Sequence, residues 1–226
     1  MMGRTHALGG AVALAAYAHV TGEVATIPAW GYLVAAGSAL VPDADNGRGT
    51  ILNRPHLYPL KLMSLPLWGP GNPRHRGRTH SLLAAGAWVA LVWFWFLLAN
   101  LGLDALDAGF QLPFTGIVAA AGLGYLSHLL LDMFNIEPLQ LLWPLPLDVG
   151  FPPWRARGFL PGRFHAGAWF WEGTMIWFPL LAFAGWFAVQ YGATVVAATN
   201  ADKTIWQALT FIVRAFVDLI TGAVRS

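Results

Sequence analysis

Residues 81–103 read SLLAAGAWVALVWFWFLLANLGL, and this run decides the class of the protein. It contains no charged side chain and exceeds the roughly 20 apolar residues that a helix needs to cross a bilayer. The whole chain has the same character. Of its 226 residues, 57% are hydrophobic and 11% are charged, whereas about 25% are charged in soluble domains. We therefore expect an all-α membrane protein.

Four further apolar segments flank this run. Residues 7–20 and 27–41 are short for a span and are joined by a brief turn, so we expect a tight hairpin there. Residues 112–134 and 174–198 are long enough to cross. Residues 204–224 alternate apolar and charged side chains at helical spacing, which predicts an amphipathic helix packed on the bundle or lying in the interface. The predicted fold is a polytopic bundle of about five spanning or hairpin helices plus this C-terminal helix.

The charges in the connections predict an orientation. The two long connections, 43–80 and 135–172, carry Arg and Lys, whereas the turns around Glu23, Asp104 and Asp107 carry only acidic residues. Loops rich in Lys and Arg stay in the cytoplasm. We therefore expect a multi-pass protein whose N-terminus and long loops are cytoplasmic. The second long loop is dense in Pro and Trp, which favours a rigid segment in the membrane interface.

A short motif occurs twice. Residues 3–8 read GRTHAL, residues 77–82 read GRTHSL, and each copy opens an apolar hairpin that ends near an aspartate, Asp43 or Asp132. The two hairpins begin on the same face, so their relating axis would run along the membrane normal. We predict a single membrane domain over 1–226, with parallel hairpin repeats at 1–45 and 77–134, the Pro/Trp-rich loop at 135–172 and C-terminal helices at 173–226.

On this topology, the candidate metal ligands share one membrane face. His6 and His80 begin helices, Asp43 ends one, and His128 and Asp132 lie four residues apart on one helical face. Ionisable groups near hydrocarbon are costly unless they are paired, solvated or bound to an ion. The chain has no cysteine, so a metal would be held by imidazole and carboxylate groups. These ligands predict one or two divalent ions, zinc first and manganese or magnesium as alternatives.

Further polar residues near the same face complete the predicted site. The possible additional ligands are His75 and Asp45; the candidate catalytic residues are Asp45, Glu172 and Arg76; and the candidate phosphate-binding residues are Arg4, Arg76 and Arg78. Thr5 and Thr79 precede the two motif histidines, and we expect their hydroxyls to cap the helices and orient those rings.

Each of these motifs also has a purely structural interpretation. His128 and Asp132 form a simple hydrogen-bonded pair in that reading, and the segment after Pro42 is an ordinary helix end and turn. The arginines at 74–78 could be a positive-inside flank. What favours a metal site is that all the ligands lie at one depth and follow the repeat.

The same residues resemble the YdjM-type family of inner-membrane proteins, which are regarded as metal-dependent hydrolases. The resemblance rests on four motifs over roughly residues 1–150: Thr5-His6, Leu40-Val41-Pro42-Asp43-Ala44-Asp45, His75-Arg76-Gly77-Arg78-Thr79-His80-Ser81, and Ser127-His128 to Asp132 with Leu142-Trp143-Pro144. The family is thought to be distantly similar to zinc-dependent phospholipase C enzymes. This resemblance implies a helical, phosphoesterase-like metal site at His6, Asp43, His80, His128 and Asp132. The chain departs from the family pattern at 135–138, where it reads NIEP instead of a segment with Gly and Thr.

The resulting hypothesis is a hydrolase of the inner membrane. A metal-bound hydroxide would attack a phosphoester in a lipid or lipid-linked substrate at the cytoplasmic headgroup level. Its partners would be membrane lipids and a lipid-like or phosphorylated substrate, with no nucleic acid. The chain lacks the Gly-x-Ser-x-Gly and His-Glu-x-x-His motifs of serine hydrolases and zincins. The alternative is a non-catalytic scaffold or a transport protein, in which the metal is structural or cargo.

Overall fold

The computed structural model describes residues 3–45, 55–68, 77–112, 115–135, 137–145, 147–150, 173–203, 207, 210–211 and 213–214. Within these ranges the chain is helical, and its only β contact is an isolated bridge between Leu139 and Val149. The α-helices are α1 (Gly3–Thr21), α2 (Ala29–Ser38), α3 (Tyr58–Trp68), α4 (Leu82–Ala105), α5 (Thr115–Asp132) and α7 (Phe178–Ala201). Short helical turns are η1 (Glu23–Thr26), η2 (Pro42–Asp45), η3 (Pro55–Leu57), η4 (Arg78–His80) and the π-turn η5 (Gly173–Trp177).

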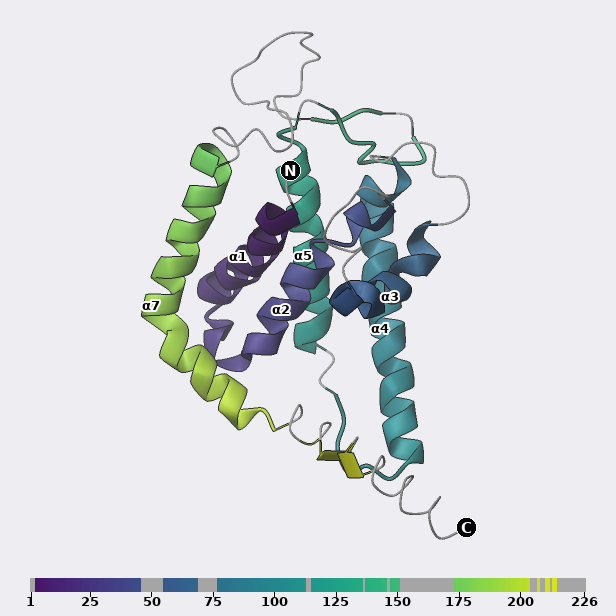
Figure 1. Cartoon of the computed structure of the whole chain (residues 1–226), viewed down its shortest axis with the longest axis vertical. Helices are drawn as coiled ribbons and strands as arrows, with labels where there is room; N and C mark the ends of the chain where they lie inside the picture. The colour runs from purple at the N-terminus through teal and green to yellow at the C-terminus, as the bar shows by residue number, and fades with distance from the viewer. Residues whose placement is uncertain are drawn as a thin grey trace.

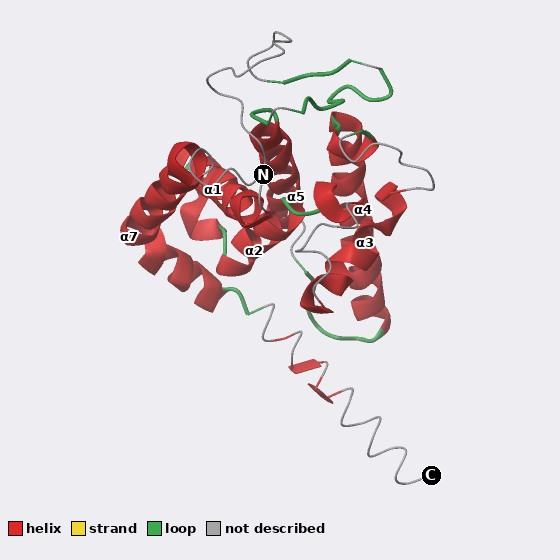
Figure 2. Ribbon diagram, turned by 45° about the horizontal axis from the view of Figure 1, so that its top comes forward, coloured by secondary structure: helices red, strands yellow, loops and turns green. Residues whose placement is uncertain are grey.

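Three helices, α1, α2 and α5, form the centre of the bundle, and each packs against the other two. Figures 1 and 2 show α7 on one side of this trio and α4 with α3 on the other. Helices α1 and α2 form the predicted N-terminal hairpin, but α2 has only 10 residues and does not span a membrane. The all-helical fold is confirmed, while the parallel repeat stays a prediction.

The short helix α2 fits between α1 and α5 because glycine faces it from both sides. A Cβ at Gly10 of α1 or at Gly124 of α5 would overlap the carbonyl oxygen of Ala35. Ala35 itself is fully buried. Small residues let helix backbones approach closely. In lipid this close van der Waals packing stabilises helix association, because lipid tails are as apolar as the side chains and the hydrophobic effect contributes little. The position of α2 therefore depends on these two glycines.

The two flanking helices are the candidate membrane spans. The segments Leu82–Ala105 and Met175–Ala201 are each long and apolar enough to cross a bilayer. Only 22% of the apolar window in the first and 6% in the second is buried within the protein. A core helix of a soluble protein would be mostly buried, so these faces are suited to lipid. We treat both helices as membrane-spanning.

Helix α3 was not predicted from the sequence. The prediction of one polar connection over 43–80 is wrong for Tyr58–Trp68, which is helical. Pro59 and Pro66 argue against a helix in the sequence, because proline usually indicates a loop or turn. Here Pro59 lies in the first turn, where its missing N–H is not needed, whereas Pro66 lies inside the helix and removes one backbone hydrogen bond.

Two predicted segments are described only in part. Most of the C-terminal stretch 204–224 lies outside the described residues, and its described residues, 207, 210, 211, 213 and 214, are helical. In the loop 135–172, Leu139 and Val149 exchange backbone hydrogen bonds of 2.8 and 2.7 Å. The amide of Leu82 donates to the carbonyl of Leu141 at 2.9 Å, which ties this loop to the start of α4. Residues 151–172 lie outside the described part of the chain.

Candidate metal centre

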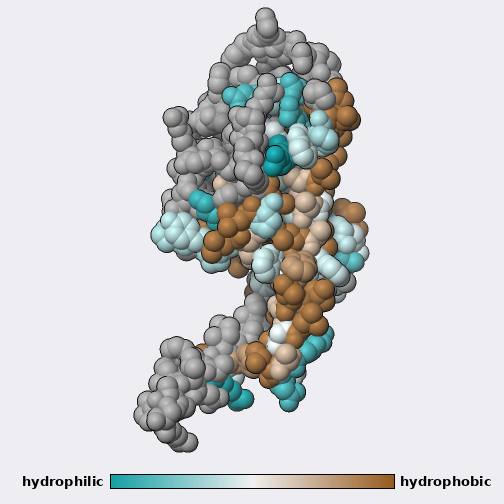
Figure 3. Space-filling model, turned by 90° about the vertical axis from the view of Figure 1, so that its right-hand side faces the viewer, coloured by the Kyte–Doolittle hydropathy of each residue, from teal (hydrophilic) through white to brown (hydrophobic). Residues whose placement is uncertain are grey.

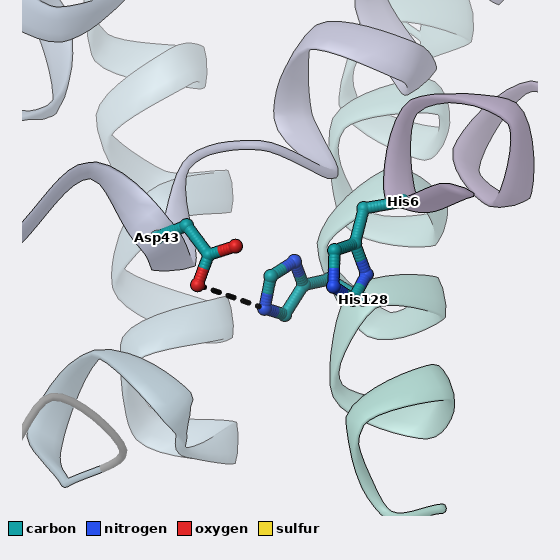
Figure 4. Close-up of side chains that lie close together, drawn as sticks. All are labelled: His6, Asp43 and His128. Carbon is teal, nitrogen blue, oxygen red and sulfur yellow. Dashed lines mark ion pairs between the residues drawn. The ribbon is translucent and has the colours of Figure 1, made fainter. Parts of the chain in front are cut away.

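Five ionisable side chains from four elements meet at one end of the central trio. His6 comes from the first turns of α1, Asp43 from η2 and His80 from η4, while His128 and Asp132 come from the last turns of α5. Figure 4 shows the rings of His6 and His128 side by side, with the carboxylate of Asp43 pointing toward His128. The predicted ligands therefore lie together, although the first and the last are 126 residues apart in the sequence.

The carboxylate of Asp132 contacts all three imidazoles. Its Oδ1 lies 3.2 Å from His6 Nε2, and its Oδ2 lies 3.6 Å from His80 Nε2 and 3.8 Å from His128 Nε2. The carboxylate of Asp43 contacts two of the same rings. Its Oδ1 lies 3.5 Å from His80 Nε2 and 3.8 Å from His128 Nε2. The Nε2 atoms thus point into a space bounded by two carboxylates.

The three rings also lie close to one another. His80 Nε2 and His128 Nε2 are 3.1 Å apart. The rings of His6 and His128 are stacked, with centroids 3.8 Å apart and planes inclined by 22°. Protonated imidazoles would repel one another at these distances, whereas neutral imidazoles whose lone pairs face one cation would not.

Atoms outside the cluster orient two of its side chains. His128 Nδ1 lies 2.7 Å from the carbonyl oxygen of Ala39, and a carbonyl oxygen only accepts hydrogen bonds. His128 Nδ1 therefore carries the proton, which leaves the lone pair on Nε2 facing the cluster. Asn135 Nδ2 donates to Asp132 Oδ1 at 2.6 Å. Metal-binding histidines and carboxylates are usually held by such partners.

Burial of the cluster is nearly complete. His6, His80, His128 and Asp132 are at most 1% exposed, whereas the side chain of Asp43 keeps 24% of its surface accessible. Among the described residues, neither ring nitrogen of His6 makes a hydrogen bond of regular geometry, although Asp132 is near Nε2. A buried polar atom without a partner is costly, so it calls for an explanation. A cation between the His6 ring and its neighbours would supply one.

The available donors match a divalent metal ion. His6, Asp43 and His128 each offer one atom, and these atoms lie within 4.8 Å of one another. The same holds for His80, His128 and Asp132. Nitrogen and oxygen donors in this ratio suit zinc, and two overlapping sets of three suit one ion or two. The buried His and Asp residues could therefore hold a metal.

Electrostatics keeps Asp43 ready as a ligand. Burial by itself raises the pKa of this carboxyl, but positive charge on the neighbouring rings of His128, His80 and His6, when they carry protons, outweighs burial and holds the pKa well below its usual range. A bound cation in place of those protons would act in the same direction. Asp43 is therefore an ionised carboxylate at neutral pH, which is the form that binds cations.

The start of α4 holds His80 in place. Ser81 is the N-cap: its Oγ accepts from the amide of Ala84 at 3.1 Å and donates to the carbonyl of Arg78 at 2.6 Å. Tyr125 of α5 donates its hydroxyl to the carbonyl of Thr79. The prediction that Thr79 caps this helix is wrong, because η4 moves the helix start to Leu82. Thr5 likewise lies inside α1 and does not cap it.

Thr79 contacts the candidate centre in a different way, and this contact is testable. Its Oγ1 lies 3.1 Å from His80 Nδ1, the ring atom that faces away from the cluster. Thr79→Val keeps the shape and removes the hydroxyl, so we expect zinc affinity to fall by about tenfold, as for other partners of metal-binding histidines. Competition with a fluorescent chelator measures this affinity. Thr79→Ser is expected to restore it, and equal affinities of all three proteins would contradict this role.

The two motif arginines stack on tryptophans near the cluster. Arg4 lies over the ring of Trp177 at 5.6 Å, and Arg78 lies over the ring of Trp143 at 5.3 Å. Each arginine is two residues before a cluster histidine. Of the other predicted site residues, His75, Arg76 and Glu172 lie outside the described residues, as does the side chain of Asp45.

Several contacts of the centre were not found from the sequence. The contact of the Ala39 carbonyl with His128 cannot be predicted from the sequence, because the backbone of any residue at position 39 would present the same oxygen. Asn135 has one weak signal, since it follows Asp132 by three residues at a helix end. The tryptophan partners of the arginines come from distant segments that only the fold brings near.

Comparison with known proteins decides the family. The sequence matches the model of the YdjM inner membrane protein family over residues 1–217. The chain belongs to the YdjM family. It is also 35% identical over 122 residues to "Inner membrane protein YdjM" of Escherichia coli (strain K12), and the protein of the same name from Shigella flexneri gives the same values. That alignment covers 51% of this chain and 50% of each relative, so the chain spans about half the length of the curated relatives it matches. No solved structure matches the chain.

Membership of the YdjM family agrees with the fold. The family is described as an inner membrane protein, and the described part of this chain contains two helices that could span a membrane. The cluster of His6, Asp43, His80, His128 and Asp132 lies wholly inside the matched range. Its function is a separate question.

Proposed function

We propose that this YdjM-family protein is a membrane-bound, metal-dependent hydrolase that cleaves a phosphoester of a lipid or lipid-linked substrate at the cytoplasmic headgroup level. The observation that carries the proposal is the buried convergence of three imidazoles and two carboxylates from four elements. Such a costly arrangement inside a membrane protein is maintained for function by default. Zinc is the preferred ion, and one or two ions fit the two donor sets.

The donor sets indicate the chemistry that the centre would support. A divalent ion held by His6, Asp43, His80, His128 and Asp132 would polarise a phosphoryl oxygen and activate water at neutral pH. Asp45 and Glu172 are the proposed proton acceptors. In the chain, Asp45 follows Asp43 by two residues, and Glu172 directly precedes η5.

The arginines supply the proposed phosphate contacts. Arg4 and Arg78 stack on Trp177 and Trp143, and a stacked guanidinium directs its N–H edge outward. That edge matches the paired oxygens of a phosphate group. Arg76 is the third proposed phosphate ligand, on the basis of its place in the His75–Ser81 motif.

The cytoplasmic location is proposed from charge. The cluster lies at the end of the bundle from which both basic connections, 43–80 and 135–172, depart. Basic connections remain on the cytoplasmic side of inner-membrane proteins. The acidic turns around Glu23 and Asp104 join the helices at their opposite ends.

One observation favours a second function. Four of the five donors are almost fully buried, and a closed shell of protein ligands is typical of a structural metal. In that case the ion would hold α1, η2, η4 and α5 together in a scaffold. The partial exposure of Asp43 favours the hydrolase, because a catalytic ion keeps one position open.

The decisive experiment measures metal and activity together. Wild type, His80→Ala and the control His19→Ala are purified in detergent, and zinc per chain is measured by mass spectrometry. His19 lies in the far turn of α1 and bonds to Tyr191 at 2.8 Å, away from the cluster. We expect His80→Ala to lose most of its zinc and its hydrolysis of phosphomonoesters and phosphodiesters, and His19→Ala to keep both.

The other outcomes separate the alternatives. Full zinc content in His80→Ala would reject the metal centre. Zinc that is lost in His80→Ala, without activity of the wild type on any phosphoester, would support the structural role.

A further inference from the structure

Helix α3 is largely apolar on both faces, although it carries Lys61 and Ser64, which is unusual for a short helix between polar segments. On its inner side, Leu60 packs against the buried pair Leu40 and Ala44, and Met63 and Leu67 pack against the core around Trp88. This side is what anchors α3 to the bundle. A helix at a water-exposed surface would carry polar residues on its other side.

The outer side of α3 is mainly apolar instead, with the half-buried Lys61 at its edge. Tyr58, Leu62 and Leu65 follow one another at spacings of four and three residues, so they form one stripe. Their exposed fractions are 49%, 63% and 48%. Pro59 and Pro66 on the same helix are exposed too. A contiguous exposed apolar stripe of this kind is typical of a surface that meets lipid or another apolar partner.

The stripe is continuous with a surface that faces lipid. Helix α3 packs against α4, one of the two candidate spans, and Leu82 and Leu83 at the start of α4 are also exposed. Figure 3 looks onto the side of the molecule where α3 and α4 lie and shows an apolar band running along it. The acyl chains that cover α4 are therefore the nearest apolar material for α3.

The open edge of the metal centre lies on the same side. Asp43 is the one cluster residue with a substantially accessible side chain, and it belongs to η2. Helix α3 packs against both η2 and η4, the elements that carry Asp43 and His80. Any molecule that approaches the centre through Asp43 therefore passes next to α3.

We propose that α3 lies in the acyl-chain region of the leaflet and borders a lateral entrance from the bilayer to the metal centre. The substrate would then carry at least one long hydrocarbon chain, which lies along Leu62 and Leu65 while its phosphoester reaches Asp43. The location of α3 stands on the structure alone, whereas the substrate class rests on the proposed function.

The location can be tested without any enzyme activity. The chain has no cysteine, so one introduced cysteine is the single site that a thiol-reactive label can modify. Leu62→Cys and Leu65→Cys in the full chain are labelled with bimane and reconstituted into phosphatidylethanolamine and phosphatidylglycerol vesicles. Val189→Cys, in the exposed middle of α7, serves as the lipid reference, and Leu106→Cys, in the exposed α4–α5 turn, as the water reference.

The two possible outcomes are clear. We expect dibrominated acyl chains to quench the labels at 62 and 65 as they quench the label at 189, with little quenching by aqueous iodide. Quenching by iodide to the extent seen at 106, without quenching by brominated lipid, would overturn the proposal.

A second measurement tests the substrate class. The double variant Leu62→Gln/Leu65→Gln is compared with Val196→Gln, an exposed position on α7. On phosphatidic acid in vesicles we expect about a tenfold lower rate for the double variant only, and no change on water-soluble p-nitrophenyl phosphate. An equal loss on both substrates would reject the entrance. A wild type inactive on both would reject a lipid phosphomonoester as the substrate, the phosphodiester assays above would still decide the proposed hydrolase, and the quenching result would still decide where α3 lies.

Discussion

Asp132→Asn is expected to abolish stable zinc binding. Asp132 is the carboxylate that approaches His6, His80 and His128 together, at 3.2 to 3.8 Å. Amide nitrogen is no metal ligand at neutral pH, and the change removes one negative charge from a buried site. Loss of an outer partner alone lowers metal affinity by about 10- to 100-fold, so loss of this ligand should exceed about 100-fold. Zinc per chain, measured after dialysis against a chelator, is the readout.

The matched control is Asp107→Asn. Asp107 lies in the exposed turn after α4 with a φ of 51°, a conformation that asparagine adopts readily. This variant is expected to keep its zinc. Circular dichroism of both variants shows whether the helices persist, so that lost zinc is not confused with unfolding. Stoichiometric zinc in folded Asp132→Asn would exclude this aspartate as a ligand.

Gly124→Ala is expected to destabilise the bundle more than any other single methyl group. The new Cβ would overlap the carbonyl oxygen of Ala35, and a backbone atom of a packed helix cannot turn aside as a side chain can. Helix α2 would have to move away from α5. Overpacking of this kind costs about 1–3 kcal/mol, and we expect the upper end of that range. Unfolding by sodium dodecyl sulfate, followed by circular dichroism, measures the change.

Gly116→Ala in the same helix is the control. No atom outside the helix backbone lies within 4 Å of a Cβ at Gly116. Gly116 is the second residue of α5, so replacing it by alanine without a clash is expected to stabilise the helix by less than the roughly 0.5–1 kcal/mol typical of a helix interior. The two variants should therefore shift the unfolding midpoint in opposite directions. Identical midpoints would show that α2 does not depend on this close contact.

Gly124→Ala should also weaken the metal centre indirectly. Helix α2 leads into Ala39, whose carbonyl orients His128, and then into Asp43. A shift of α2 away from α5 would displace both groups from the imidazoles. The glycine contacts and the cluster are thus two parts of one packing arrangement.

The fold class and the location of the centre could be predicted from the sequence for the same reason. A run such as 81–103 has one stable conformation in lipid, because every backbone group must be hydrogen-bonded within the segment. Once the helices are set, His6, Asp43, His80, His128 and Asp132 all fall at helix ends on one face. The succession of helices and turns along the chain is enough to predict at which end of the bundle each of these residues lies.

The remaining features depended on contacts that the order of the chain does not show. Ser81 and not Thr79 caps α4, because the cap is set by where the backbone leaves η4. Helix α3 forms in spite of two prolines because Leu60, Met63 and Leu67 bury against the bundle.

The sequence by itself determined a helical membrane protein with its imidazoles and carboxylates at a common depth, since hydrophobic length and charge act locally along the chain. Only the tertiary structure decided that these groups meet within 4 Å, that Ala39 holds the ring of His128, and that α3 lies beside Asp43. Those relations arise from helices packing side by side, where glycines at 10 and 124 set the distance and residues far apart in sequence become neighbours.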